Sequence, residues 1–204
     1  MAQEITWELF EKQVAECRLC ALCRNIQHKV PGQGDPHAPL MLIGEGPGRD
    51  EDAQGLAFVG AAGQLLTRML AAIQLPRDRV YICNVVKCRP PQNRIPTPEE
   101  AEACKIHLRN QVWLVRPKVI LLLGSTAAKN VLGPDIRITR DRGKWVEKKG
   151  VWMLPTYHPS ALLRDEAKKP EAWADMQSLR DKLKELSLYQ DLYGKAKPET
   201  EGEG

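Results

Sequence analysis

Three short stretches of this sequence combine residue types that could bind and polarise a ligand. They are the glycine-rich segment 44–52, the single Asn84, and the segment 157–160, which contains His158. Glycine-rich loops leave backbone N–H groups open, an asparagine offers donors and an acceptor, and a neutral histidine can donate a hydrogen bond. Such groups suit a reaction in which negative charge develops on a bound group, because nearby donors stabilise that charge.

Each stretch, taken alone, has an ordinary explanation. The glycine-rich segment could be a plain turn or a phosphate cradle, although no Gly-Lys-Ser/Thr follows it and a nucleotide P-loop is disfavoured. Asn84 could be a core amide bonded to backbone, and His158 could be a turn histidine before a proline. The joint occurrence of all three at the ends of apolar runs is what indicates a shared site.

The sequence also contains six cysteines, which are Cys17, Cys20, Cys23, Cys83, Cys88 and Cys104. Three disulfides could form, but the first residues do not resemble a secretion signal, so we expect a reducing, cytoplasmic location. There, thiolates more often bind an iron-sulfur cluster or zinc. The spacing Cys17-x2-Cys20-x2-Cys23 is also typical of part of a ferredoxin motif, yet no fourth cysteine followed by proline completes it.

Alternating strands and helices must position these groups. Apolar runs predict strands at 39–44, 79–86, 119–123 and 151–154, the last of them ended by Pro155. Helical spacing and capping residues predict helices at 6–16, 60–73, from Thr97, from 125 to 133, and at 171–188, with an extended or hairpin excursion at 136–149. Apolar strands that alternate with helices indicate a mainly parallel sheet covered on both faces, with ligands at the carboxyl ends of its strands.

The 204 residues suffice for one domain, which we place at 1–193, and the polar segment 194–204 is expected to be a disordered tail. No apolar run approaches the roughly 20 residues that span a bilayer, so no membrane contact is expected. The net charge is +4. Some of the cationic residues form two clusters in the sequence, either of which could face a polyanion or be a solvated surface. The first cluster is Lys87, Arg89 and Arg94, and the second is Arg137, Arg140, Arg142, Lys144, Lys148 and Lys149.

Four segments together resemble the family 4 uracil-DNA glycosylases in order and spacing. They are 44–52 (Gly-Glu-Gly-Pro-Gly-Arg-Asp-Glu-Asp), 58–60 (Phe-Val-Gly), 84–94 (Asn-Val-Val-Lys-Cys-Arg-Pro-Pro-Gln-Asn-Arg) and 158–160 (His-Pro-Ser). The similarity extends from about Cys17 to Leu188. It implies a three-layer αβα fold with a four-stranded parallel sheet flanked by helices. It also implies a monofunctional DNA glycosylase, which flips uracil out of DNA, hydrolyses the N-glycosidic bond and leaves an abasic site for base excision repair.

The resemblance assigns roles within the pocket. It implies that His158, with backbone N–H groups of the 44–48 loop, donates towards uracil O2 as the leaving base becomes anionic. The Asn84 carbonyl would accept from uracil N3–H and its amide would donate to O4, whereas cytosine presents the reverse pattern. Phe58 would stack on the extruded base, unless it is an ordinary core aromatic.

Three positions of the pocket depart from the best-known glycosylase family. Glu45 replaces a glutamine, Gly46 replaces the aspartate that positions the attacking water, and Gly48 replaces the tyrosine that excludes the methyl group of thymine. Glu45 could orient water, block the methyl group, or do both. We expect all three residues to line the uracil pocket.

Contacts to DNA are expected from two segments, through Ser160, Leu162, Leu163, Arg164, Arg89 and Arg94. The segment 160–164 resembles a loop that wedges into the base stack, where Leu162 or Leu163 would fill the gap and Arg164 would meet phosphate or a minor-groove edge. The alternative is a helix start whose apolar residues face the core. Arg89 and Arg94 would shape a basic surface towards phosphates.

The resemblance also implies four ligands of a 4Fe-4S cluster, which are Cys17, Cys20, Cys88 and Cys104. Cys23 falls where relatives commonly have an apolar residue, and Cys83 is typical of a small buried hydrophobe. Because hydrolysis needs no electrons, the cluster is expected to be structural.

Two other classes of function stay open. A non-catalytic uracil or lesion sensor would keep the pocket, although the arginine-rich insertion of a subgroup that traps the sugar covalently is missing here. An iron-sulfur electron-transfer module would explain the cysteines and leave Asn84 and His158 without a task. The expected partner is uracil-containing DNA, bound by a monomer, with a sliding clamp or other repair proteins as further candidates.

Overall fold

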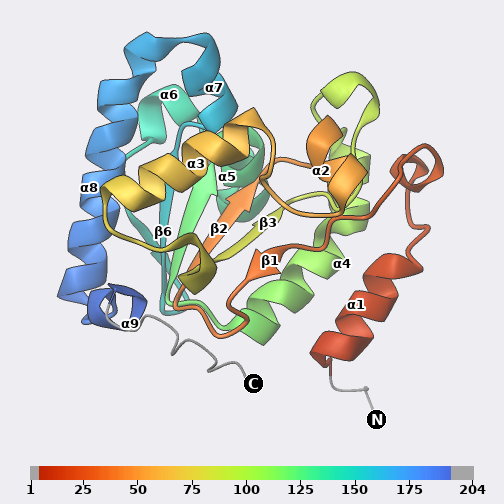
Figure 1. Ribbon diagram of the computed structural model, residues 1–204, viewed down its shortest axis with the longest axis horizontal. Helices are drawn as coiled ribbons and strands as arrows, with labels where there is room; N and C mark the ends of the chain where they lie inside the picture. The colour runs from red at the N-terminus through yellow and green to blue at the C-terminus, as the bar shows by residue number, and fades with distance from the viewer. Residues whose placement is uncertain (1–4, 194–204) are drawn as a thin grey trace, which may run out of the picture.

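A six-stranded sheet forms the middle of the protein, within residues 5–193, which the computed structural model describes (Figure 1). The strands follow the order β1-β3-β2-β4-β6-β5. Their bounds are β1 Gln33–Gly34, β2 Leu40–Gly44, β3 Tyr81–Asn84, β4 Val119–Leu123, β5 Val146–Lys148 and β6 Val151–Thr156. The tail that we predicted to be disordered, 194–204, lies outside the described residues.

The four central strands are parallel as predicted, but the sheet has six strands and not four. The two additional strands, β1 and β5, pair antiparallel at the edges. They are only two and three residues long and have no buried residue, so no apolar run marks them in the sequence. The pairing of β5 with β6 confirms a hairpin at the end of the excursion at 136–149, but its first part is not extended, since it contains the helix α6, Ile138–Asp141.

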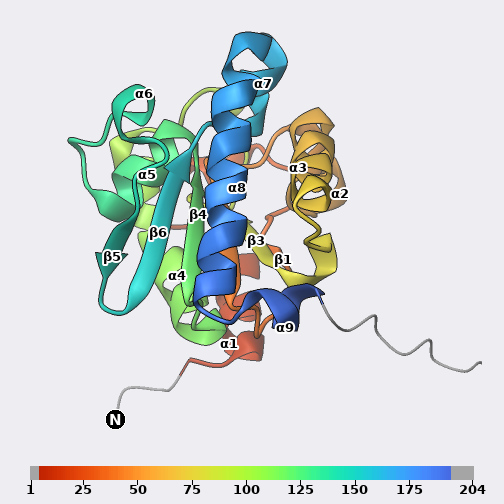
Figure 2. The same cartoon turned by 90° about the vertical axis from the view of Figure 1, so that its left-hand side faces the viewer.

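Helices cover both faces of the sheet, which confirms the predicted three-layer αβα architecture (Figure 2). The α-helices are α1 Trp7–Ala15, α2 Arg49–Gln54, α3 Ala61–Ala72, α4 Pro98–Val115, α5 Gly124–Leu132, α6 Ile138–Asp141, α7 Pro159–Arg164, α8 Lys169–Glu185 and α9 Tyr189–Tyr193. The short 3₁₀ helices are η1 Ala21–Arg24, η2 Arg77–Arg79, η3 Pro91–Asn93 and η4 Glu166–Lys168. Among residues 5–193, no helix is long and apolar enough to cross a membrane.

Alternate residues of the central strands point to opposite faces. Leu42 and Leu121 pack with the buried residues of α3, α8 and α9. Ile43 and Leu122 pack with those of α4 and α5. Strands β2 and β4 are buried on both faces, so their sequences are continuous apolar runs.

Helix ends follow the capping residues found in the sequence. The Leu9 N–H donates to the Thr6 hydroxyl at 3.2 Å, which starts α1. Thr97 and Glu100 cap α4 reciprocally, with N–H donors 3.2 and 2.9 Å from the two side chains. Helix α2 has no counterpart among the predicted helices, because its six residues contain no apolar stripe.

Strand β6 continues through Pro155 to Thr156, so the prediction that this proline ends the strand is wrong. A proline lacks the N–H group that a flanking strand would require. On the edge side, β5 pairs only with 151–153, and no ladder bond is needed there at Pro155. The longer strand carries the chain to His158 at the carboxyl edge of the sheet.

Candidate active site

One open cavity at the carboxyl edge of the parallel strands brings together the three stretches singled out in the sequence. Its lining includes Glu45 after β2, Asn84 at the end of β3 and His158 after β6. The first residues of α5, which follow β4, complete this wall. The cavity thus lies where the sheet topology predicts a ligand.

Asn84 presents an unpaired acceptor. Its side chain is 1% exposed, and its Oδ1 has no hydrogen-bond partner among the described residues. A buried acceptor left in this state costs about 1–3 kcal/mol, so a ligand N–H would relieve it. Gly44, opposite in register, leaves the necessary space, since a Cβ there would lie 2.5 Å from Oδ1 and would overlap the Phe58 ring.

His158 caps α7 in a geometry that fixes its tautomer. The Ser160 backbone N–H donates to His158 Nδ1 at 3.1 Å, and the Ser160 hydroxyl lies 2.8 Å from the same nitrogen. Because a backbone N–H can only donate, Nδ1 is the acceptor and the ring proton sits on Nε2. Burial, with a smaller contribution from the charge of Arg164, lowers the pKa of His158 to about 4. The ring is therefore a neutral donor at Nε2.

Phe58 joins the cavity to the core. It is 5% exposed, packs in the core with α3, and also lines the cavity, so both sequence interpretations apply. Its ring centroid is 5.6 Å from that of His158, with the planes 33° apart. The backbone φ is +53°, a conformation that non-glycine residues rarely adopt and that often marks functional positions. Gly63 permits it, because a Cβ there would overlap the Phe58 carbonyl group.

Glu51, which the sequence reasoning did not select, fastens this wall. Its Oε2 accepts from the Gly48 N–H at 3.0 Å, and its Oε1 accepts from the N–H groups of Val59 and Gly60, both at 2.9 Å. One carboxylate thus ties the loop after β2 to the segment that carries Phe58. The available signal was the glutamate three residues after Gly48, in the position of a capping box.

Glu45 is held by a residue on helix α5 that no local pattern indicates. The Thr126 hydroxyl on α5 donates to the Glu45 carboxylate. Beside it, Gly46 lies close to the segment that follows β3, since a Cβ at Gly46 would lie 2.7 Å from the Val86 side chain. Gly46 and Gly48 line the cavity, as we expected.

The loop that follows Cys88 forms another wall and is internally bonded. The Arg89 Nε donates to the Asn93 side chain at 2.7 Å. Arg94 makes a bidentate ion pair with Glu100, at 2.8 and 2.7 Å, and this pairing lowers the pKa of the carboxyl group. Both arginines line the cavity, but Arg94 is already engaged by the start of α4.

The two leucines proposed as a wedge both lie on α7, but one is buried and the other is exposed. Leu162 is 2% exposed and packs with Tyr157 and Ala172, so the alternative of an apolar residue facing the core applies to it. Leu163 is 46% exposed and remains able to reach DNA. Ser160 and Arg164 line the cavity beside it.

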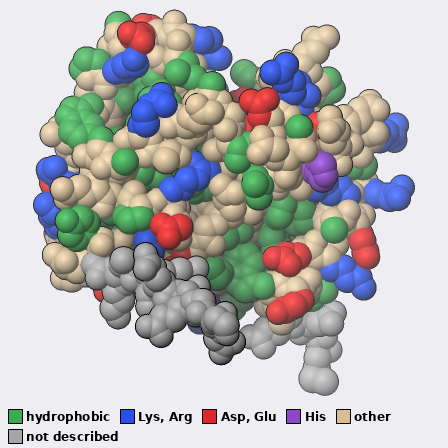
Figure 3. All heavy atoms as spheres, viewed as in Figure 1, with side chains coloured by type: hydrophobic (Ala, Val, Ile, Leu, Met, Phe, Trp, Pro, Cys, Tyr) green, Lys and Arg blue, Asp and Glu red, His purple; other side chains and the backbone are tan. Residues whose placement is uncertain are grey.

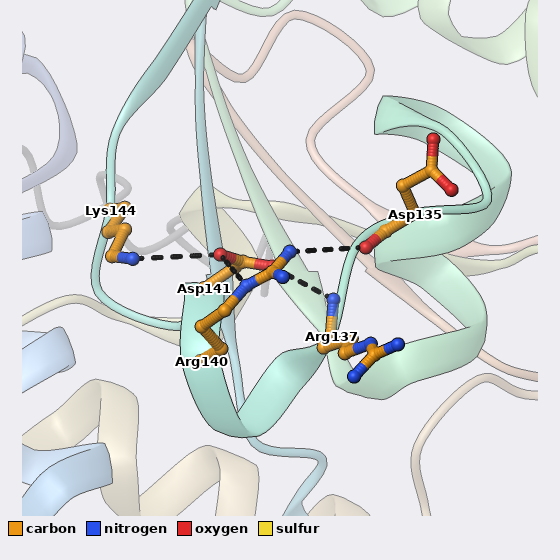
Figure 4. A network of polar contacts seen from close by, with 5 residues as sticks. All are labelled: Asp135, Arg137, Arg140, Asp141 and Lys144. Atoms are coloured by element: carbon orange, nitrogen blue, oxygen red, sulfur yellow. Dashed lines mark hydrogen bonds and ion pairs between the residues drawn. The ribbon is translucent and has the colours of Figure 1, made fainter.

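Three cations of the basic stretch after Ile136, Arg140, Arg142 and Lys144, pair with nearby carboxylates. Arg140 and Lys144 both pair with Asp141, at 2.7 and 3.6 Å (Figure 4). Arg142 bonds Asp175 on α8 through two nitrogens, at 2.9 and 2.5 Å. Figure 3 likewise shows cationic and acidic side chains interspersed over one face of the molecule. This cluster therefore fits the solvated-surface interpretation better than a continuous basic patch.

A second, smaller cavity gathers most of the cysteines. It has about 330 Å³ including its mouth, and the thiols along it are Cys17, Cys20, Cys23, Cys88 and Cys104. Cys83 is fully buried in β3 and is not part of this lining. Within the described residues, no three cysteine, histidine or acidic side chains already converge in metal-binding geometry.

Two features of this cavity fit a metal group bound through sulfur. Burial raises the pKa of Cys88 to about 12 and also raises that of Cys104, so these two thiols give up their protons when a metal replaces them. His107 also lines the cavity, is 4% exposed, and has no partner for either ring nitrogen in the described part of the chain. An acceptor placed in the cavity would satisfy the N–H of this ring.

Comparison with known proteins agrees with these features. The family model of the uracil DNA glycosylase superfamily matches residues 31–177. A type-4 uracil-DNA glycosylase of Thermotoga maritima is 44% identical over 81% of this chain and 87% of its own length. Those of Archaeoglobus fulgidus and Saccharolobus solfataricus are 44% and 37% identical, over 82% and 92% of this chain and 88% and 92% of their own lengths. The chain therefore belongs to the uracil DNA glycosylase superfamily and, within it, to the type-4 uracil-DNA glycosylases.

Proposed function

We propose that this protein excises uracil from DNA by hydrolysing its N-glycosidic bond, which leaves an abasic site for base excision repair. The observation that carries the proposal is that one cavity contains both the unsatisfied acceptor Asn84 Oδ1 and the neutral donor His158. The similarity to enzymes named type-4 uracil-DNA glycosylases supports the same activity.

Asn84 selects the base. Its free Oδ1 accepts from uracil N3–H, and its amide NH₂ donates to O4. Cytosine offers an acceptor at N3 and a donor at N4, so both contacts would be mismatched. At about 1–3 kcal/mol for each unsatisfied buried group, two mismatches reject cytosine by a few orders of magnitude.

His158 and the glycine-rich loop stabilise the leaving group. Departure of the base places negative charge on uracil, and the Nε2–H of His158 donates towards O2 as that charge develops. Since Ser160 fixes the ring, no reorientation is needed during the reaction. Glu45, held by Thr126, is placed to orient the attacking water or to block a methyl group on the base.

The substrate base reaches this cavity only after it is flipped out of the stack, at a cost of a few kcal/mol. Phe58 offers the extruded ring a stacking surface beside His158. Leu163 is the exposed apolar side chain that can enter the gap, and Arg164 and Arg89 offer charge to the phosphates. We expect the protein to act as a monomer in the cytoplasm.

We also propose that Cys17, Cys20, Cys88 and Cys104 hold a structural 4Fe-4S cluster, as their shared cavity and its chemistry support. Such a cluster supplies cross-links among thiolates and takes no part in the hydrolysis. These cysteines would tie the segment after α1 to the loop and helix that follow Asn84. Cys23 lines the same cavity, so its exclusion from the ligands stays a prediction.

Release of free uracil from a uracil-containing oligonucleotide under multiple turnover tests the proposal. Wild-type protein should turn over, and His158→Ala should lose about 10²–10³ in kcat, the usual cost of one donor to a developing anion. Asn84→Ala should lose activity and discrimination against cytosine. Tight binding without release, or a covalent adduct, would instead identify a sensor or trap, and no interaction with uracil would refute the assignment.

A further inference from the structure

Lys87 lies between the active-site cavity and the cysteine cavity. Its side chain is 1% exposed, and its Nζ donates to the backbone carbonyl of Asn84 at 2.7 Å and to the side-chain oxygen of Gln111. Gln111, itself fully buried, donates to the Pro31 carbonyl at 2.6 Å and to the Tyr81 hydroxyl at 2.9 Å. A chain of buried hydrogen bonds thus holds the ammonium against the backbone of Asn84, at the end of β3.

No negative charge balances the Lys87 ammonium on the side of the uracil pocket, among the contacts of the described residues. Burying a charge is costly unless an opposite charge accompanies it. Both acceptors of Lys87 are neutral oxygens, so neither balances the charge. The remaining side of Lys87 faces the cavity that the cysteines line.

The cysteine side offers the missing charge. Lys87 lines the cysteine cavity together with Cys88 and Cys104, so its charge lies close to their sulfurs. One turn further along α4, both nitrogens of His107 lack partners in the described structure. A cluster held by four thiolates is anionic, and its sulfurs accept hydrogen bonds, so one group would balance the Lys87 ammonium and accept from the N–H of His107.

We propose that Lys87 is a positioning residue that couples the cysteine-bound cluster to uracil recognition. The anionic cluster holds the ammonium in the buried place from which it fixes the carbonyl of Asn84 and the end of β3. The inference rests on the cluster assignment above. It gives the cluster a task in a reaction that transfers no electrons.

Lys87→Met tests the coupling, because methionine keeps the apolar stem and removes the charge. The reduction potential of the cluster should become more negative, since the reduced cluster loses a nearby cation. The KM for uracil-containing DNA should rise about tenfold, as when one buried hydrogen-bond partner is displaced, with a smaller change in kcat. A residue that only fills space would leave the potential unmoved.

Thermal unfolding gives a second test, because the difference in melting temperature between wild type and Lys87→Met should change sign when the iron is removed. With iron bound, Lys87→Met should melt at a lower temperature than wild type. After the iron is removed by oxidation and chelation, Lys87→Met should melt higher, because only wild type then buries an uncompensated cation. If the iron-free proteins do not fold, the potential and KM decide.

Lys29→Met is the matched control. Lys29 lines the same cavity, but its Nζ donates to the Ala15 carbonyl at 2.5 Å and does not contact Asn84. It should leave KM unchanged, and Lys87→Arg should restore part of the potential. A brown Lys87→Met protein with wild-type potential and KM would overturn the coupling alone. A colourless, iron-free wild-type protein would overturn the cluster assignment.

Discussion

The two cavities differ in how their buried polar groups are satisfied. Around the active site, protein groups hold one another: Glu51 accepts three backbone N–H groups, and Ser160 fixes His158. Among residues 5–193, the buried side-chain atom without a partner there is Asn84 Oδ1, which matches a donor of the proposed substrate. The active site is therefore organised before any ligand arrives.

The cysteine cavity is organised differently. His107 has two ring nitrogens without partners in the described structure, and Lys87 has only neutral acceptors. Burial raises the pKa of the Cys88 and Cys104 thiols. We therefore expect the proposed anionic cluster to complete this region, and losing it should matter more than losing any single contact within the active site.

The largest effect is expected from Cys104→Ser. Loss of a ligand should remove the iron and lower the melting temperature by more than about 10 °C, because structural metal sites contribute several kcal/mol to folding. Iron content and thermal unfolding measure both. Cys23→Ser is the control, since Cys23 lines the same cavity and should keep the iron. A colourless Cys23→Ser protein would make Cys23 a ligand after all.

A smaller effect is expected from Glu51→Gln. The amide that replaces one carboxylate oxygen would face a backbone N–H, so the loop at Gly48 or at 59–60 would lose its tie. We expect kcat/KM to fall about 10–100-fold, with little change in iron content. Glu99→Gln, at an exposed site in the first turn of α4, is the matched control. Equal kinetics in the two variants would show that the loop holds itself.

The same contrast explains what the sequence could predict. The central strands and α4 were predictable because continuous apolar runs and a capping box are local signals. Asn84 and His158 were predictable because strand ends in a parallel sheet share one edge. The pairs Thr126–Glu45 and Lys87–Gln111 join residues 81 and 24 positions apart, and no local pattern records such contacts.

The burial of individual side chains also could not be predicted from the sequence. Leu162 and Leu163 are adjacent and chemically equal, yet only the position of α7 decides that the first is 2% and the second 46% exposed. The short edge strands β1 and β5 form because a neighbouring strand offers free backbone groups, and their own residues carry no signal. Tertiary contact, more than local propensity, settles such segments.

The loop between the cavities should separate DNA binding from folding. Arg89→Ala should weaken affinity for DNA and reduce its dependence on salt by about one counterion. Arg94→Ala should instead lower the melting temperature slightly, because Arg94 is bound to Glu100 and is only 42% exposed. Fluorescence titrations at several salt concentrations distinguish the two. If both variants lost affinity equally, the Glu100 pair would have to open when DNA binds.

The smallest effect is expected from pH, since the protein has already set the state of His158. The unfolded ring has a pKa near 6.5 and the folded ring a pKa of about 4, lowered first by burial and then by Arg164. The stability that comes from this shift is present above pH 6.5 and is lost as pH falls towards 4, because the unfolded state binds the proton first. Between pH 8 and 5, uracil release should therefore show no loss attributable to protonation of His158. NMR titration of the four histidines would test this directly, with His158→Gln to assign the signal. A ring that titrates near 6.5 would mean that His158 is exposed to water in solution, and the active site would then be no better organised than the cysteine cavity.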